Sequence, residues 1–264
     1  MVSRSSASVR ARRAMSDDSV PGALVSLVRR NRRRYGGYVV HAGIAVLFVG
    51  IAASSAFREV EDVSLAPGEA AAVGDYEVAY QEPTADLEIT DAGTLEKLVL
   101  GAELQVSRGG AEASTLSPSK SYFPSGDPES GSLSRYLIGE STSEVGLDSG
   151  VRRDLWAVVA PDTTDLESVA VRGDKIFAGA ESLPEAERSA ALGEALRRMV
   201  VRYREEVGAA NFRVLVSPLV TWIWIGALIV FCGGLISLWP APAGARSRAW
   251  ATYASRLAKE LGRA

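Results

Sequence analysis

Two long runs of apolar residues bracket a more polar middle section in this chain of 264 residues. The first run, residues 38–57, has 20 residues without a formal charge, and the second, residues 219–239, has 21. A helix of 20 residues is about 30 Å long, which matches the hydrocarbon thickness of a bilayer. The pattern therefore predicts two transmembrane helices.

The middle section alternates apolar and polar residues over short stretches, which is typical of half-buried strands. The alternation is clearest in residues 76–80 and 102–106, and a Gly109-Gly110 pair is typical of a hairpin turn. Residues 154–160 (DLWAVVA) predict a strand that buries Trp156. These signals predict a small antiparallel β barrel or sandwich.

Two segments refine that interpretation. Residues 176–178 (IFA) predict a weaker strand that ends the β region near residue 180. After it, Ser182 and Glu185 fit a capping box, and apolar residues then recur at helical spacing up to Val207. We therefore expect one amphipathic helix, with its apolar stripe packed on the sheet.

Charge is distributed very unevenly along the chain. Residues 1–37 carry a net charge of +7, residues 58–213 carry −14 and residues 241–264 carry +4. Basic flanks beside apolar spans mark the cytoplasmic side of a membrane. The expected fold class is a membrane protein of the α+β class, with two transmembrane helices flanking a mainly antiparallel β domain outside the cytoplasm.

The expected organisation follows from these boundaries. It comprises a basic cytoplasmic tail (1–37), a transmembrane helix (38–57), an extracytoplasmic β-rich domain (58–213), a strand end with the second transmembrane helix (214–239) and a basic cytoplasmic tail (240–264). Residues 21–30 and 249–264 have the pattern of short amphipathic helices on the inner leaflet, although residues 21–30 fit an ordinary basic tail almost as well.

The first apolar run has two distinct faces at about 100° per residue. One stripe is rich in small residues and suits close helix packing, as do Gly226 and Gly233 in the second run. That stripe consists of Gly43, Leu47, Gly50 and Ser54. The opposite stripe consists of His41, Ala45, Phe48 and Ala52.

His41, the only histidine of the chain, is the candidate functional residue. An ionisable side chain inside a membrane helix costs about 2–3 kcal/mol unless it is solvated, paired or ligated. The alanines beside it would leave room for something flat and bulky. Spacing alone leaves two interpretations open: a ligand, or a histidine that hydrogen-bonds a neighbouring helix.

Several kinds of chemistry are excluded or lack a signal in the sequence. The sole cysteine, Cys232, lies in the second apolar run, so the middle domain has neither an internal disulfide nor a thiol for exchange. A single histidine within an apolar run excludes an external Ser–His–Asp triad. The sequence has no Gly-rich phosphate loop, no Cys/His metal cluster and no basic aromatic surface for nucleic acid.

Four segments carry a resemblance to a known family. Residues 31–52 (NRRRYGGYVVHAGIAVLFVGIA) and 217–226 (SPLVTWIWIG) are similar to two specific motifs of CcmF-type cytochrome c biogenesis proteins, the haem lyase family. Residues 116–122 resemble the family's Leu-x-Pro-x-(Lys/Arg)-x-Tyr element, and residues 154–156 its Asp-Leu-Tyr/Trp strand. The resemblance is to the C-terminal part of the family and covers residues 31–240.

The resemblance implies a function. Family members help to join haem to the Cys-x-x-Cys-His motif of apocytochrome c outside the membrane, and they carry a structural b-type haem between two membrane histidines. By its place in the motif, His41 corresponds to one axial ligand of that haem iron. The expected function is therefore that of a subunit in cytochrome c maturation.

This sequence also departs from the family pattern. It lacks the Trp-rich haem-handling loop, a second histidine and most of the membrane spans. The resemblance therefore implies a split form in which haem b is shared with a multi-span haem-handling membrane subunit, which would supply the other ligand. Such a chain would be a component of a haem lyase complex without a complete catalytic site of its own. The alternative is a non-haem membrane-anchored scaffold or sensor with a β-rich ectodomain.

Overall fold

The computed structural model describes residues 31–90, 95–127, 129–179, 184–206, 208–239 and 253–262. The chain divides into two compact units, residues 1–49 with 222–264, and residues 50–221. Among the described residues, two helices are long and apolar enough to cross a membrane: α3 (Arg32–Ala56) and α7 (Val220–Leu238), each with a mean hydropathy of 2.0 over its apolar window. About a tenth of the apolar window of each helix is buried within the chain, which is far less than in the core helix of a globular domain.

The second unit is built on two antiparallel sheets, which confirms the predicted β architecture. The first sheet has the strand order β1-β10-β9-β8, and the second has the order β2-β3-β4-β6-β7, with β5 paired to β4. Their bounds are β1 (Glu59–Leu65), β2 (Ala70–Val73), β3 (Tyr76–Ile89), β4 (Leu95–Arg108), β5 (Ala111–Leu116), β6 (Ser119–Tyr122), β7 (Ser141–Glu144), β8 (Gly146–Ser149), β9 (Arg153–Ala160) and β10 (Ala210–Pro218).

Glycines at left-handed backbone angles make the tight turns that the sequence predicts. Gly109 and Gly110, with φ of 58° and 80°, connect β4 to β5. Gly68, with φ of 88°, lies in the turn between β1 and β2. Glycine adopts positive φ at little steric cost, so these positions allow the β4–β5 hairpin turn and the turn that leads from β1 in one sheet to β2 in the other.

The long strand β4 connects two hydrophobic cores. Its inward residues Ala102, Leu104 and Val106 are fully buried in a core formed by residues of both sheets. Leu98 and Leu100, on the same face of the strand, belong instead to a core shared with three helices. The period-2 pattern of one strand thus anchors both the sheet packing and the helical layer.

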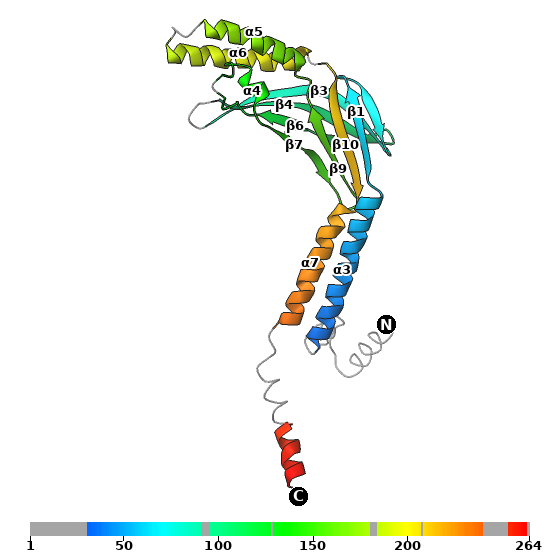
Figure 1. Cartoon of the computed structure of the whole chain (residues 1–264). Helices are drawn as coiled ribbons and strands as arrows, with labels where there is room; N and C mark the ends of the chain where they lie inside the picture. The colour runs from blue at the N-terminus through cyan, green and yellow to red at the C-terminus, as the bar shows by residue number, and fades with distance from the viewer. Residues whose placement is uncertain are drawn as a thin grey trace, which may run out of the picture. The chain divides into compact units, whose positions relative to one another are not determined.

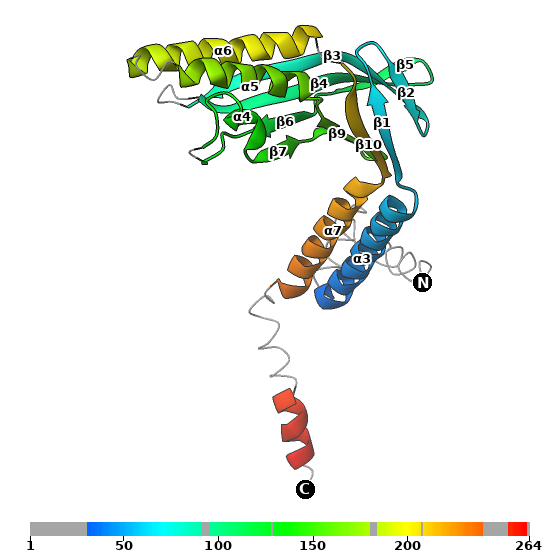
Figure 2. The ribbon, with the colours of Figure 1, turned by 45° about the horizontal axis from the view of Figure 1, so that its top comes forward.

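The helices of this unit are α4 (Arg135–Ile138), α5 (Thr164–Ala178) and α6 (Glu185–Glu206). Figures 1 and 2 show α5 and α6 side by side along the part of the sheet formed by β3 and β4. The predicted amphipathic helix is confirmed as α6, whose Leu196, Met199 and Tyr203 are buried.

The prediction of a strand at residues 176–178 is wrong, and so is the expectation of a single amphipathic helix. Residues 176–178 form the last turn of α5. Asp165 and Glu167 lie in its first turn, where their negative charges interact favourably with the positive end of the helix dipole. Leu166 and Ala170, four residues apart, are buried on one face of the helix.

The position of Trp156 also differs from the prediction. Leu155, Ala157 and Val159 point from β9 into the core, so Trp156 lies on the opposite face and is only half-buried. The tryptophan pairs in register with Leu147 and Leu215 on the neighbouring strands. The strand itself is confirmed, but its aromatic residue does not fill the core.

A strained residue joins the last strand to α7. Leu219 has a φ of 57°, which costs a non-glycine residue about 1–2 kcal/mol. Two hydrogen bonds hold the junction: the Leu219 backbone N–H donates to the Arg152 carbonyl at 3.1 Å, and Thr221 Oγ1 donates to the Gly150 carbonyl at 2.8 Å. Both acceptors, Gly150 and Arg152, lie in the turn between β8 and β9.

Candidate functional site

The two apolar helices pack against each other through glycines in the unit that contains most of both. A Cβ placed on Gly43 would lie 2.7 Å from the Val230 backbone nitrogen and 2.9 Å from the Gly226 carbonyl oxygen. On Gly233 it would lie 2.7 Å from the Val40 nitrogen. We call this contact the glycine seam, and its residues are Gly36, Val40, Gly43 and Leu47 of α3 with Gly226, Val230, Gly233 and Ser237 of α7.

The seam confirms that Gly43, Gly226 and Gly233 make close helix contacts. The contacts are made between the chain's own two helices. The alternating spacing of three and four residues keeps one face of each helix in contact. A partner would therefore meet other faces of α3 and α7.

His41 lies away from the seam. At about 100° per residue it is roughly 140° from the middle of the seam. Its side chain is exposed, and so are those of Ala45, Phe48 and Ala52 on the same stripe. Phe48 alone is 64% exposed, which leaves a broad apolar surface for another chain, lipid or a planar ligand.

One hydrogen bond determines the tautomer of the neutral His41 ring. Nδ1 lies 2.7 Å from the backbone carbonyl oxygen of Gly37. A carbonyl oxygen only accepts, so Nδ1 carries the proton, and in the neutral imidazole Nε2 keeps its lone pair. Histidines that ligate metals commonly donate their other ring N–H to a carbonyl, which sets the tautomer and orients the ring.

These features fit an axial ligand for haem iron. Neutral imidazole coordinates haem iron well. Ala45 carries only a methyl group one turn from the ring, so a flat macrocycle could approach the helix closely. The other interpretation from the sequence, a histidine that hydrogen-bonds a neighbouring helix, also stays open, because the bond within α3 uses Nδ1 and leaves Nε2 available. Residues 1–264 contain no other histidine that could supply a second imidazole.

Two further side chains share this face. The Arg34 Nε donates a hydrogen bond to the Tyr38 hydroxyl at 2.8 Å, and the guanidinium lies over the Tyr38 ring at 5.7 Å from its centroid. The sequence analysis counted Arg34 only as part of the basic flank, residues 1–37. Its spacing of seven residues from His41 was the available signal, because seven residues are two helical turns.

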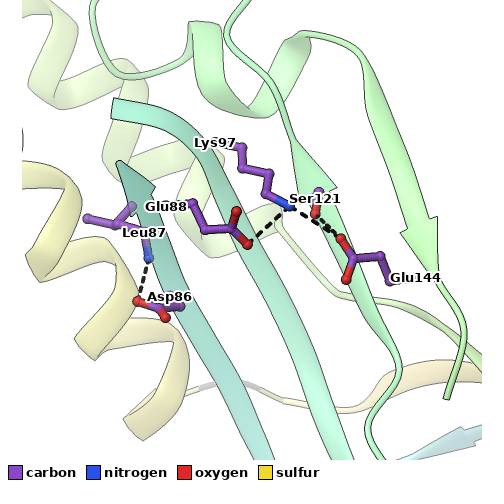
Figure 3. Close-up of polar contacts among 6 residues, drawn as sticks. All are labelled: Asp86, Leu87, Glu88, Lys97, Ser121 and Glu144. Atoms are coloured by element: carbon purple, nitrogen blue, oxygen red, sulfur yellow. Dashed lines mark hydrogen bonds and ion pairs between the residues drawn. The ribbon is translucent and has the colours of Figure 1, made fainter. Parts of the chain in front are cut away.

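The second sheet contains an ion-pair network across neighbouring strands (Figure 3). Lys97 Nζ lies 3.1 Å from a Glu88 carboxylate oxygen and 3.3 Å from Glu144 Oε1, and Ser121 Oγ donates to Glu144 at 3.0 Å. The Ser121 hydrogen bond, followed by Lys97, lowers the pKa of Glu144, and the hydrogen bond to Glu88 raises the pKa of Lys97. This arrangement links β3, β4, β6 and β7 through side-chain contacts.

Among the described residues, no group of three or more His, Cys, Asp or Glu side chains could hold a metal ion. Burial raises the pKa of Tyr80 to about 12 and also raises that of Tyr203. Neither hydroxyl has a hydrogen-bond partner in the described part of the chain. Such groups are core side chains with a polar end, so His41 stays the leading candidate.

The described residues form an α+β protein with two helices apolar enough to cross a membrane. No protein-family model matches the sequence. The chain is 26% identical over 219 residues to the cytochrome c-type biogenesis protein CcmF of Pseudomonas aeruginosa, covering 82% of this chain and 24% of that protein. It is 25% identical over 204 residues to CcmF of Escherichia coli, covering 77% and 22%.

A third relative is the cytochrome c-type biogenesis protein ccl1 of Rhodobacter capsulatus, 24% identical over 245 residues, with 91% of this chain and 27% of that protein covered. A solved structure of the cytochrome c haem lyase CcmF aligns with a TM-score of 0.46 and 21% identity, over 80% of this chain and 26% of that one. The chain thus spans about a quarter of the length of its curated relatives. These sequence matches confirm the resemblance to CcmF-type cytochrome c biogenesis proteins.

Proposed function

We propose that this chain is a subunit of the cytochrome c maturation machinery and supports the covalent attachment of haem to apocytochrome c outside the membrane. The sequence similarity to CcmF-type proteins supports this role. The observation that carries it furthest is His41, exposed on an apolar helix with Nδ1 bonded to its own backbone and Nε2 available.

The proposed cofactor is haem b. His41 would supply one axial ligand through Nε2, and Ala45 and Ala52 would lie against the macrocycle. When bound, the haem would supply an iron centre capable of one-electron chemistry. Ligation by the iron would also offset the cost of placing an imidazole within the bilayer.

The proposed placement puts α3 and α7 across the cytoplasmic membrane, with both termini in the cytoplasm. Residues 1–37 and 240–264 would form the basic cytoplasmic tails, residues 38–57 and 214–239 would contain the spans, and residues 58–213 would form the extracytoplasmic domain. The charge asymmetry supports this orientation, since the flanks carry +7 and +4 and the middle carries −14.

Cysteine labelling tests this orientation. In a Cys232→Ser background, Ser143→Cys in β7 and Ala258→Cys near the C-terminus place one thiol at an exposed position on each proposed side. In intact cells an impermeant thiol reagent should label the Ser143→Cys variant alone, and the Ala258→Cys variant only after lysis. Labelling of the Ala258→Cys variant in intact cells would contradict the proposed orientation.

The proposed partners are a multi-span haem-handling membrane subunit and apocytochrome c. The exposed His41 face supports the first of these, because a haem ligated there needs a second ligand and a covering surface from another chain. The acidic middle domain would act as a structural or docking part; among its described residues, no group of three or more His, Cys, Asp or Glu side chains could hold a metal ion.

The test is a His41→Ala substitution in the full complex, with Val49→Ala on another exposed face of α3 as a matched control. The His41→Ala complex should lose its b-haem absorbance and yield less holocytochrome c while the chain stays in the membrane. The Val49→Ala complex should retain both. Full b-haem absorbance in the His41→Ala complex would overturn the assignment of His41, and normal holocytochrome c in cells lacking the chain would overturn the proposed function.

A further inference from the structure

Arg34 and Tyr38 form a polar pair on the face of α3 that carries His41. Arg34 is two helical turns before His41, so it is rotated by only about 20° from the histidine, and Tyr38 by about 60°. Both side chains are exposed. The glycine seam lies on the far side of the helix, so the pair and the histidine face the same surroundings.

The Tyr38 hydroxyl determines where the guanidinium lies. Helical side chains lean toward the N-terminus, so an unconstrained arginine at residue 34 would point away from His41. The 2.8 Å bond from Arg34 Nε to the hydroxyl of Tyr38, four positions later, fixes the guanidinium beside the Tyr38 ring, on the face of the helix that carries His41. The His41 ring also leans toward the N-terminus, and seven residues of helix rise separate the two positions by roughly 10 Å.

The pair leaves strong donors for an anion. The bond to Tyr38 uses Nε, so both terminal Nη groups retain their N–H donors. Two parallel N–H groups match the two oxygens of a carboxylate, and a charge-assisted pair of this kind is about twice as strong as a neutral hydrogen bond. The apolar surface next to the pair strengthens such a contact by excluding water.

We propose that Arg34, held in place by Tyr38, binds a propionate carboxylate of the haem whose iron His41 ligates. This inference rests on the proposed function. A macrocycle that lies flat against α3, with its iron at His41, carries both carboxylates on one edge. The arginine two turns toward the basic end of the helix orients that edge toward the cytoplasmic surface, so Arg34 acts as a binding and orienting residue.

A lipid phosphate could also bind the Arg34 guanidinium. A comparison of Arg34 with Arg33 distinguishes binding of a lipid phosphate from binding of a haem propionate. Arg33 carries the same charge one residue earlier and is also exposed, but it lies about 80° around the helix from His41. A phosphate of a mobile lipid can be reached from either arginine. A propionate of a haem held by His41 would have a fixed position, and only Arg34, on the same face as His41, would reach it.

The experiment compares Arg34→Gln, Arg34→Lys and Tyr38→Phe with Arg33→Gln in the purified complex. Two quantities are measured: the rate at which haem b is lost during detergent washing and the midpoint potential of the haem. Arg34→Gln should accelerate haem loss about tenfold, since a charge-assisted bond is lost. It should also lower the midpoint potential, because removing a cation near the iron favours the ferric state.

Arg34→Lys should recover the potential but only part of the retention, because lysine keeps the charge and loses the two-pronged contact. Tyr38→Phe should accelerate haem loss more weakly, and Arg33→Gln should change neither quantity. Equal effects of Arg33→Gln and Arg34→Gln, or no effect of Arg34→Gln while His41→Ala abolishes the b-haem spectrum, would overturn this inference alone. A full b-haem spectrum in the His41→Ala complex would overturn the proposed haem site as well.

Discussion

The glycine seam offers a sharp test of the packing of the two apolar helices. In Gly43→Ala the new methyl carbon would lie 2.7 Å from the Val230 nitrogen and 2.9 Å from both the Gly226 oxygen and Val230 Cγ2. Two of these three atoms belong to the backbone, so a rotamer change cannot relieve the contact. The helices would have to separate. Gly37→Ala is the matched control on the same helix, because its methyl group would have nothing within 4 Å.

The magnitude follows from two opposing contributions. Replacing a mid-helix glycine with alanine favours the helix by about 0.5–1 kcal/mol, and this gain is common to both variants. Overpacking costs about 1–3 kcal/mol and applies to Gly43→Ala only. Gly43→Ala should therefore be less stable than Gly37→Ala by about 1–3 kcal/mol, and Gly37→Ala should be as stable as the unmodified chain or slightly more so.

Unfolding by SDS in mixed micelles measures this difference. Helix separation can be followed by the fluorescence of Trp222 and Trp224, both in α7. The transition midpoint should be lowest for Gly43→Ala, and that of Gly37→Ala should equal or slightly exceed that of the unmodified chain. Equal midpoints for Gly43→Ala and Gly37→Ala would refute the close approach of the helices. A second pair, Gly233→Ala against Gly234→Ala, repeats the comparison from α7, where only the first position meets the facing backbone.

Three predictions concern the unit of residues 50–221. The Ser121 hydrogen bond, followed by Lys97, lowers the folded pKa of Glu144, so the stabilising effect of this carboxylate should be lost as pH falls below 4.5. Thermal melts should show Glu144→Gln differing from the original chain by less than about 1 kcal/mol, because the group is exposed. Tyr203→Phe should match or exceed the original chain in chemical denaturation, since its buried hydroxyl has no partner among the described residues. Leu155→Ala should cost about 2–5 kcal/mol and clearly more than Trp156→Ala.

Each of the three has a clear contrary result. Equal acid sensitivity of Glu144→Gln and the original chain would show that the Lys97 network does not stabilise the domain. A loss of more than about 1 kcal/mol in Tyr203→Phe would show that its hydroxyl is bonded. A larger loss for Trp156→Ala than for Leu155→Ala would place the tryptophan in the core after all.

Local signals predicted the strands and turns well. The Gly109-Gly110 turn and the alternation in residues 102–106 appear in the structure because positive φ and a period of two are direct consequences of residue type. Helix α6 followed from apolar spacing for the same reason. These features depend on residues that are close together in the sequence, so the sequence alone is enough to predict them.

Features that depend on tertiary pairing were harder to predict. The β-branched Ile176 favoured a strand, but the acidic first turn of α5 and its contact with the β3–β4 core determine the helix. The sequence showed Trp156 in an apolar run, and such a run does not reveal which face meets the core. The sequence also showed a stripe of small residues on α3, but not that α7 of the same chain occupies it.

For the candidate site, the sequence supplied His41 and its stripe but not its surroundings. The exposure of that stripe depends on which face α7 covers, and the tautomer of the ring depends on the bond to the Gly37 carbonyl. The contact between Arg34 and Tyr38 needed a structure as well, because helix geometry places the two side chains on one face without showing whether they meet.

The most direct test of the central claim is the midpoint potential and visible spectrum of haem b in a complex that carries His41→Met. Replacing an imidazole ligand with a thioether raises the potential of haem iron and changes its absorption bands. If His41 ligates the iron, the His41→Met complex should show a raised potential and altered bands, or lose the haem. A haem b with an unchanged potential and spectrum in that complex would show that His41 is not its ligand.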